Sequence, residues 1–232
     1  MCKRAIFSYV FFSLILSLAT KELSTKDLQM GSLEVVCGSM YAGKSEALIR
    51  LLKRAEYAKK IVHIFKPSID IRTSVDKVYS HNGNNLPATP IDTQKPEDIL
   101  LFPDLDTIDV VGIDEAQFFH PTIVDVVDKL IAMGKQVIVV GLDLDFKQKP
   151  FGAMPILLAK GDKITKLNAV CLICGKEAYV SQRLVNGKPA KEDDPLILIG
   201  AKEAYEARCR NCYALTPAGQ SNVAQVLHNS HD

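Results

Sequence analysis

The feature that most restricts the fold of this chain is a glycine-bracketed loop between an apolar strand and an amphipathic helix. Residues 38–45 read Gly-Ser-Met-Tyr-Ala-Gly-Lys-Ser, which matches the spacing G-x-x-x-x-G-K-[ST] in full. The apolar run 33–37 precedes the loop, and a helical pattern follows it with Leu48, Leu51, Leu52 and Ala55 on one face. In this context backbone N–H groups of the loop and the positive end of the helix converge on phosphate oxygens. The sequence therefore predicts a nucleoside triphosphate site.

Two side chains of this loop have specific expected roles. Lys44 would reach the outer phosphates, and the Ser45 hydroxyl would bind a magnesium ion. The competing interpretation is a chance glycine turn before a surface helix. The residues expected to contact the nucleotide are Gly38, Ser39, Met40, Tyr41, Ala42, Gly43, Lys44 and Ser45.

A second apolar strand, residues 109–113, ends in the acidic pair Asp114-Glu115 and continues with Ala116 and Gln117. Asp114 at a strand tip can orient magnesium through a water, or it can be a plain strand-end carboxylate. Glu115 can accept a proton from an attacking hydroxyl or water, or it can form a salt bridge at the surface. We expect all four residues to line the nucleotide site.

Strands and helices alternate along the first two thirds of the chain. Apolar runs predict further strands at 60–65 and 136–140. A helix is expected between them, beginning at Pro121 and ending at Gly134 in a left-handed stop. Such alternation predicts an α/β fold: a RecA-like P-loop NTPase with a mostly parallel sheet and helices on both faces. Ligands of such sheets bind outside the carboxyl ends of the strands.

Two C-x-x-C pairs mark the C-terminal part of the chain, Cys171 with Cys174 and Cys209 with Cys212. Four thiolates from two such knuckles suit a closed, structural Zn²⁺ site. The 34 residues between the pairs exceed the usual ribbon spacing of about 15–20, so an insertion must lie between the knuckles. Two disulfides are the alternative. Cys37, on the strand before the phosphate loop, is expected to be a small buried residue.

The composition is that of an ordinary globular chain of 232 residues, and a net charge of +1 gives no argument for nucleic-acid or membrane attraction. Residues 1–29 stand apart, because Lys3-Arg4 precedes an apolar stretch that ends in a small-x-small pattern. We interpret this extension as a signal-like segment, as a misassigned start before Met30, or as a helix packed on the fold. The expected segments are 1–29, a nucleotide-binding domain 30–162, a zinc-ribbon domain 163–217 and a tail 218–232.

Taken together, the segments resemble the type II thymidine kinases from about Ser32 to about Cys212. The match is carried by loop 38–45, Lys66-Pro67 with Asp70 and Arg72, Ser80 to Gly83, Asp114 to Phe119, Gly141 to Asp143, Asp145-Phe146, Pro150 to Gly152, both cysteine pairs, Ala178, Arg183 and Tyr205.

The resemblance implies transfer of the γ-phosphoryl group of ATP to the 5′-hydroxyl of thymidine, and of deoxyuridine. It makes Glu115 the catalytic base and gives Ser45 and Asp114 to magnesium. It also implies that the insertion between the two cysteine pairs is a lasso-like loop that covers the nucleoside. The implied substrate contacts are Phe146, Phe151, Leu196, Ile197, Leu198, Ile199, Gly200 and Tyr205, with Asp70 and Arg72 nearby. It also implies a cytoplasmic homotetramer with no nucleic-acid or membrane partner.

Two other functions compete with this one. A zinc-ribbon ATPase that depends on nucleic acid shares the P-loop and the acidic strand end, but its ribbon should carry clustered Lys and Arg. The ribbon here carries acidic residues: Glu192, Asp193, Asp194, Glu203 and Glu206. An exported binding protein would rest on the apolar N-terminal stretch and would need disulfides in place of zinc.

Overall fold

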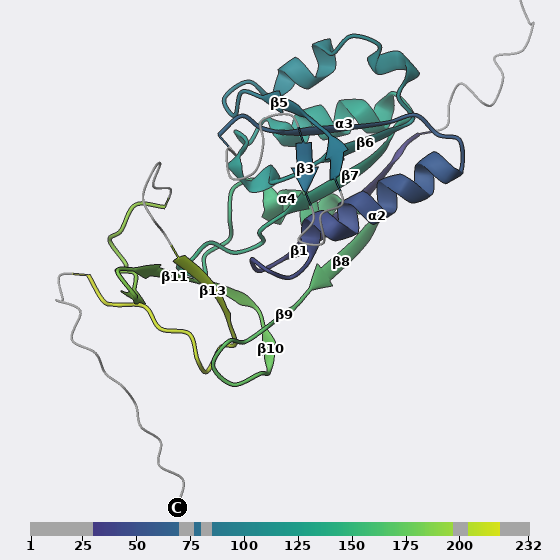
Figure 1. The fold of residues 1–232 in the computed structure, drawn as a ribbon. Helices are drawn as coiled ribbons and strands as arrows, with labels where there is room; N and C mark the ends of the chain where they lie inside the picture. Colours follow the sequence, from purple (N-terminus) through teal and green to yellow (C-terminus); the bar gives the residue numbers. More distant parts are fainter. Residues whose placement is uncertain (1–29, 70–76, 80–84, 197–203, 219–232) are drawn as a thin grey trace, which may run out of the picture. The chain divides into compact units, whose positions relative to one another are not determined.

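The computed structural model describes residues 30–69, 77–79, 85–196 and 204–218, and the statements below concern these ranges. Its centre is a sheet of six strands, all parallel, in the spatial order β5-β2-β6-β7-β1-β8 (Figure 1). The strands are β1 (Ser32–Gly38), β2 (Val62–Pro67), β5 (Thr89–Ile91), β6 (Val110–Ile113), β7 (Gln136–Gly141) and β8 (Lys163–Leu167).

Helices cover both faces of this sheet, as the alternation of strands and helices predicts. On one face lies α2 (Lys44–Tyr57), and on the other lie α3 (Ile123–Ala132), α4 (Met154–Lys160) and the 3₁₀ helix η2 (Pro96–Leu101). Successive strand residues point to opposite faces, so Val36 packs in the cluster under α2 while Val35 packs in the cluster under α3 and α4. Both faces are therefore apolar, and the strands are buried on both sides.

Most predicted elements are present, with small differences at their ends. The strand expected from Lys60 begins at Val62, and the helix expected from Pro121 begins at Ile123 with Thr122 as its N-cap. Gly134 follows α3 with φ 78°, the left-handed stop that the sequence predicts.

Three small sheets accompany the central one. β3 (Lys77–Tyr79) pairs with β4 (Asn85–Pro87), β9 (Ala169–Val170) with β10 (Glu177–Ala178), and β11 (Val180–Val185) with both β12 (Lys188–Pro189) and β13 (Ala204–Arg208). We call β9 to β13 together with the two cysteine pairs the ribbon. The segment expected from residue 163 onward thus begins with β8, which pairs with β1 in the main sheet, and the ribbon begins at Ala169.

The interpretations of residues 1–29 lie outside the described residues. Within the ranges that the structure describes, no helix combines the length and the apolar character needed to cross a membrane.

Leu130 on α3 tests the packing of this helix on the sheet, because its side chain is fully buried in the cluster under α3 and α4. We expect Leu130→Ala to lower the free energy of unfolding by about 2–5 kcal/mol through lost apolar contact and an unfilled cavity. Urea unfolding of the purified chain measures this change. Lys129→Ala, which alters the exposed neighbour on the same helix, should stay within about 0.5 kcal/mol of the parent. An equal loss of unfolding free energy in both variants would contradict the packing of Leu130 against the sheet.

Candidate functional site

The phosphate loop lies where β1 ends and α2 begins. Gly38 closes β1 with φ 144°, and a Cβ there would lie 2.2 Å from the backbone oxygen of Leu167, so the close approach of β8 requires glycine. Gly43 is the N-cap of α2 with φ 80°, a conformation that glycine adopts without strain. The loop therefore has the backbone that its two glycines predict, at a helix N-terminus that favours anions.

The Lys44 ammonium is held inside this loop. Its Nζ donates a hydrogen bond of 2.8 Å to the backbone oxygen of Ser39, and the side chain is buried.

Cys37 lies on β1, next to the loop. Burial and then the nearby Asp143 carboxylate raise the pKa of the Cys37 thiol to about 11. Cys37 is thus a neutral, buried side chain, as predicted from its place on the strand.

The acidic pair lies directly after β6. Asp114 is buried, and its Oδ1 accepts a 3.0 Å hydrogen bond from the backbone N–H of Glu115. Glu115 has φ 49° and ψ 42°, in the left-handed region that glutamate rarely adopts. Backbone strain of this kind persists only where the surroundings enforce it, and it concentrates at functional sites.

Gln117 holds the Glu115 side chain in place. Its Nε2 donates to Glu115 Oε2, and its Oε1 accepts a 3.0 Å hydrogen bond from the backbone N–H of Leu142, just after β7. The space around Gln117 is tight, because a Cβ on Gly141 would lie 2.7 Å from its Oε1 and a Cβ on Gly152 would lie 2.3 Å from its backbone oxygen. The sequence marks Gln117 only as a nucleotide contact, and this clamp between two strand ends depends on tertiary structure.

The sheet order brings the loop and the acidic pair to one edge. β7 lies between β1 and β6, and the register pairs Cys37 with Gly141 and Ile113 with Val139. The carboxyl ends of the three strands are therefore level to within three residues. Since neighbouring strands lie about 4.8 Å apart, β1 and β6 are separated by about 10 Å. The phosphate loop and Glu115 thus follow strands that end at the same sheet edge, two strand spacings apart.

The two predicted aromatic contacts are buried near this edge. Phe151 packs edge-on against Phe118 at 5.6 Å between ring centroids, and the Arg183 guanidinium lies 4.9 Å from the Phe146 ring centroid. Tyr205 pairs with Arg183 across β11 and β13, so both side chains lie on the same face of these strands. This packing fixes the positions of the aromatic rings without excluding substrate contact.

Arg183 on β11 contacts a later segment of the insertion between the two cysteine pairs. The Arg183 guanidinium donates a 2.6 Å hydrogen bond to the backbone oxygen of Pro195, next to Leu196. Other residues predicted to contact substrate lie outside the described ranges: Asp70, Arg72, Ile197, Leu198, Ile199 and Gly200.

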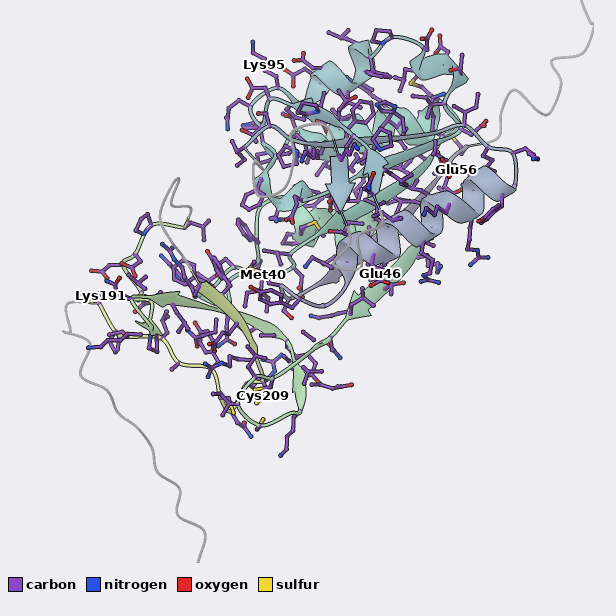
Figure 2. The ribbon with its side chains drawn as sticks, viewed as in Figure 1. Met40, Glu46, Glu56, Lys95, Lys191 and Cys209 are labelled. Carbon is purple, nitrogen blue, oxygen red and sulfur yellow. The ribbon has the colours of Figure 1, made fainter. Side chains whose placement is uncertain are left out.

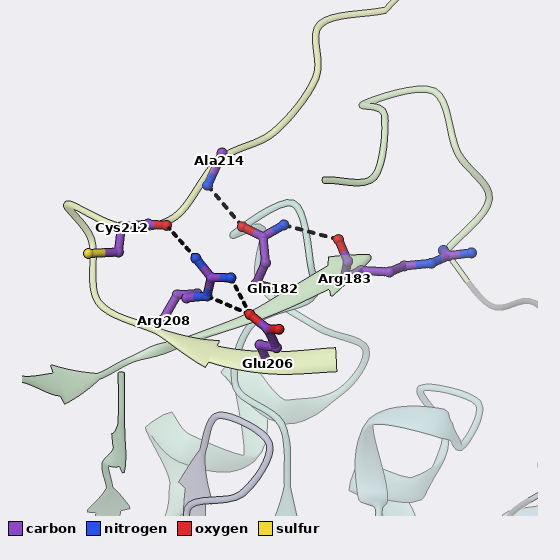
Figure 3. A network of polar contacts seen from close by, with 6 residues as sticks. All are labelled: Gln182, Arg183, Glu206, Arg208, Cys212 and Ala214. Carbon is purple, nitrogen blue, oxygen red and sulfur yellow. Dashed lines mark hydrogen bonds and ion pairs between the residues drawn. The ribbon is translucent and has the colours of Figure 1, made fainter. Parts of the chain in front are cut away.

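The ribbon is tied together by polar contacts (Figure 3). Gln182 accepts a 2.9 Å hydrogen bond from the Ala214 backbone N–H and donates one to the Arg183 backbone oxygen. Arg208 forms an ion pair with Glu206 and donates a 3.3 Å hydrogen bond to the Cys212 backbone oxygen. Burial raises the pKa of Tyr213 to about 12, so its hydroxyl stays protonated and donates a 2.6 Å bond to the Phe146 backbone oxygen. The ribbon is thereby fastened to the loop that follows β7.

The four predicted metal ligands form one cluster, seen as sulfur atoms near Cys209 (Figure 2). The Sγ atoms of Cys171, Cys174, Cys209 and Cys212 all lie within 4.8 Å of one another, and those of Cys174 and Cys209 are 3.6 Å apart. A tetrahedral Zn²⁺ with bonds of about 2.3 Å separates its sulfurs by about 3.8 Å, whereas a disulfide holds them at about 2.0 Å. Backbone hydrogen bonds from Cys209, Cys174 and Ile173 outweigh burial and lower the pKa of Cys171 to about 6. The arrangement fits one structural zinc ion and not two disulfides.

Fold and site together define a P-loop-type α/β nucleotide-binding protein with a four-cysteine site suited to zinc. A family model described as Thymidine kinase matches residues 31–213. The chain belongs to the thymidine kinase family, and it is therefore a phosphotransferase that acts on nucleosides.

We expect the purified chain to carry one zinc ion, because all four sulfurs have the spacing that a single tetrahedral ion requires. Cys174→Ser should lower zinc content below half an equivalent and lower the melting temperature, as measured by elemental analysis and calorimetry. Cys37→Ala changes a buried cysteine outside the cluster and should keep the full equivalent. Full zinc in the Cys174→Ser variant would contradict the assignment.

Proposed function

We propose that the chain transfers the γ-phosphoryl group of ATP to the 5′-hydroxyl of thymidine, which gives thymidine monophosphate and ADP. The observation that carries the proposal is the placement of Glu115: it follows a strand that ends at the same sheet edge as the phosphate loop, with its carboxylate clamped by Gln117. Family membership supports both substrates.

The phosphate loop supplies the grip on ATP. Its backbone N–H groups and the N-terminus of α2 favour the β- and γ-phosphates, and the Lys44 ammonium can leave the Ser39 oxygen for a phosphate oxygen of higher charge. Catalysis of this kind depends on positioning and on charge stabilisation more than on covalent chemistry.

Glu115 supplies the proton acceptor. The 5′-oxygen of the nucleoside attacks the γ-phosphorus, its proton passes to the Glu115 carboxylate, and the bond between the γ-phosphorus and the bridging oxygen of ADP breaks. The hydrogen bond from Gln117 fixes the orientation of the carboxylate before the substrate arrives.

Ser45 and Asp114 are the residues that would hold Mg²⁺. Ser45 follows Lys44 in the first turn of α2, and Asp114 is a buried carboxylate at the same sheet edge, so both offer the hard oxygen ligands that Mg²⁺ prefers. Bound there, the ion would neutralise charge on the β- and γ-phosphates.

The nucleoside is expected beside Phe146, Phe151 and Tyr205, under the part of the insertion that follows Pro195. A lid that excludes water favours transfer to the nucleoside over hydrolysis of ATP. We propose deoxyuridine as a second substrate, because a pocket discriminates a single methyl group by only about 10- to 200-fold. A homotetramer is also proposed, on the family resemblance alone, and light scattering measures it.

Glu115→Gln tests the proton acceptor. Product formation from ATP, Mg²⁺ and thymidine should fall about 10²- to 10⁴-fold in kcat, since general-base catalysis contributes that much, while binding of an ATP analogue remains. Glu56→Gln, an exposed carboxylate at the far end of α2, should keep the parent rate.

Two results would contradict the proposed phosphoryl transfer with Glu115 as the proton acceptor. An unchanged kcat in Glu115→Gln would remove the carboxylate from the reaction. No nucleoside phosphorylation, together with ATP hydrolysis stimulated by DNA, would favour the nucleic-acid-dependent ATPase.

A further inference from the structure

The phosphate loop is held by the ribbon as well as by its own strand and helix. The backbone N–H of Met40, which is labelled in Figure 2, donates a 2.9 Å hydrogen bond to the Ser181 hydroxyl on β11. The Ser39 hydroxyl lies 3.5 Å from the backbone oxygen of Ala178 and donates to it. Ser181 and Ser39 are both buried, at 3% exposed each, so water does not compete freely for these bonds.

The Met40 N–H and the Ser39 carbonyl belong to one peptide unit. A peptide unit is planar and rigid, so a bond at one end fixes the direction of the other. At the carbonyl end the Ser39 oxygen accepts the 2.8 Å hydrogen bond from Lys44 Nζ. The Ser181 hydroxyl therefore sets the orientation of the group that holds the Lys44 ammonium.

The strand that presents Ser181 is paired and packed within the ribbon. Ser181 pairs with Ala207 across β11 and β13, and Ala42 of the phosphate loop packs against the small apolar cluster that contains Ala207, Cys171 and Cys209. The loop thus touches the core of the ribbon by apolar contact and by two hydrogen bonds.

Arg183 lies two residues along β11, on the same face as Ser181. Its contacts with Phe146 and with the Pro195 oxygen connect this face to the loop after β7 and to the segment at Pro195. One short strand therefore contacts both the phosphate loop and Pro195.

We propose that Ser181 is a positioning residue for Lys44: through the Ser39–Met40 peptide, its hydroxyl holds the phosphate loop ready for nucleotide. The inference rests on the proposed function only in assigning phosphate binding to Lys44. Without the acceptor on Ser181 the peptide can rotate, and the hydrogen bond from Lys44 to the Ser39 oxygen is then weakened.

Binding of a fluorescent, non-hydrolysable ATP analogue to the full-length, zinc-loaded chain tests this, with Mg²⁺ and without nucleoside, so that any contact of Ser181 with the nucleoside does not enter. Ser181→Ala should weaken binding about five- to tenfold, the effect of one lost hydrogen bond. Ser181→Thr keeps the hydroxyl and should restore affinity to within about twofold. Ser181→Cys, close to serine in shape but a weak acceptor, should resemble the alanine variant.

Thr216→Ala is the matched control. It removes a hydroxyl that follows the ribbon in the chain and donates its hydrogen bond to the Pro189 backbone oxygen on β12. We expect parent affinity from this variant. Zinc content and melting temperature, measured for every variant, separate a lost loop contact from a damaged ribbon.

A double-mutant cycle asks whether Ser181 acts through Lys44. In a Lys44→Met background, Ser181→Ala should weaken binding by less than twofold, because the side chain that it positions is gone. Parent affinity in Ser181→Ala, or an undiminished loss in the Lys44→Met background, would overturn the inference. Failure of the parent chain to bind the analogue would instead overturn the proposed function.

Discussion

Because β6, β7 and β1 run parallel beside one another, their carboxyl ends meet at one edge of the sheet, and the site depends on that meeting. Parallel pairing requires both faces of the sheet to be covered, which α2 on one side and α3 and α4 on the other provide. Each strand then delivers one component to the edge: a phosphate loop from β1 and an acidic pair from β6. Leu142, directly after β7 between them, supplies the backbone N–H that anchors Gln117.

The site combines strained backbone with tight packing. Glu115 adopts a left-handed conformation, and Gln117 fixes its carboxylate. Gly141 leaves space for the Gln117 side-chain oxygen, and Gly152 leaves space for the Gln117 backbone oxygen. Strain of about 1–3 kcal/mol at such a residue must be offset by the surrounding fold. The well-buried sheet supplies that stability, so the carboxylate is oriented before a substrate binds.

The ribbon serves two parts of the site. Its four cysteines gather the two ends of the insertion at one point, and its β11 strand contacts the phosphate loop through Ser181 and the loop after β7 through Arg183. A metal ion bound there would stabilise a segment too small to have a sufficient apolar core of its own. The pairing of β11 with β13 lets a short strand position groups beside the main sheet.

The sequence by itself determined the strand-loop-helix unit at residues 38–45, the acidic end of β6 and the four sulfur ligands, because each is a local pattern whose chemistry follows from spacing. It did not place Lys163–Leu167 in the main sheet, since β8 is a partly exposed edge strand that lacks the continuous apolar run of the buried strands. Nor did it reveal the clamp by Gln117 or the bond between Met40 and Ser181, which are 141 residues apart. Periodicity reports which face of an element is buried, whereas the partner on that face is decided only when the strands take their order in the folded sheet.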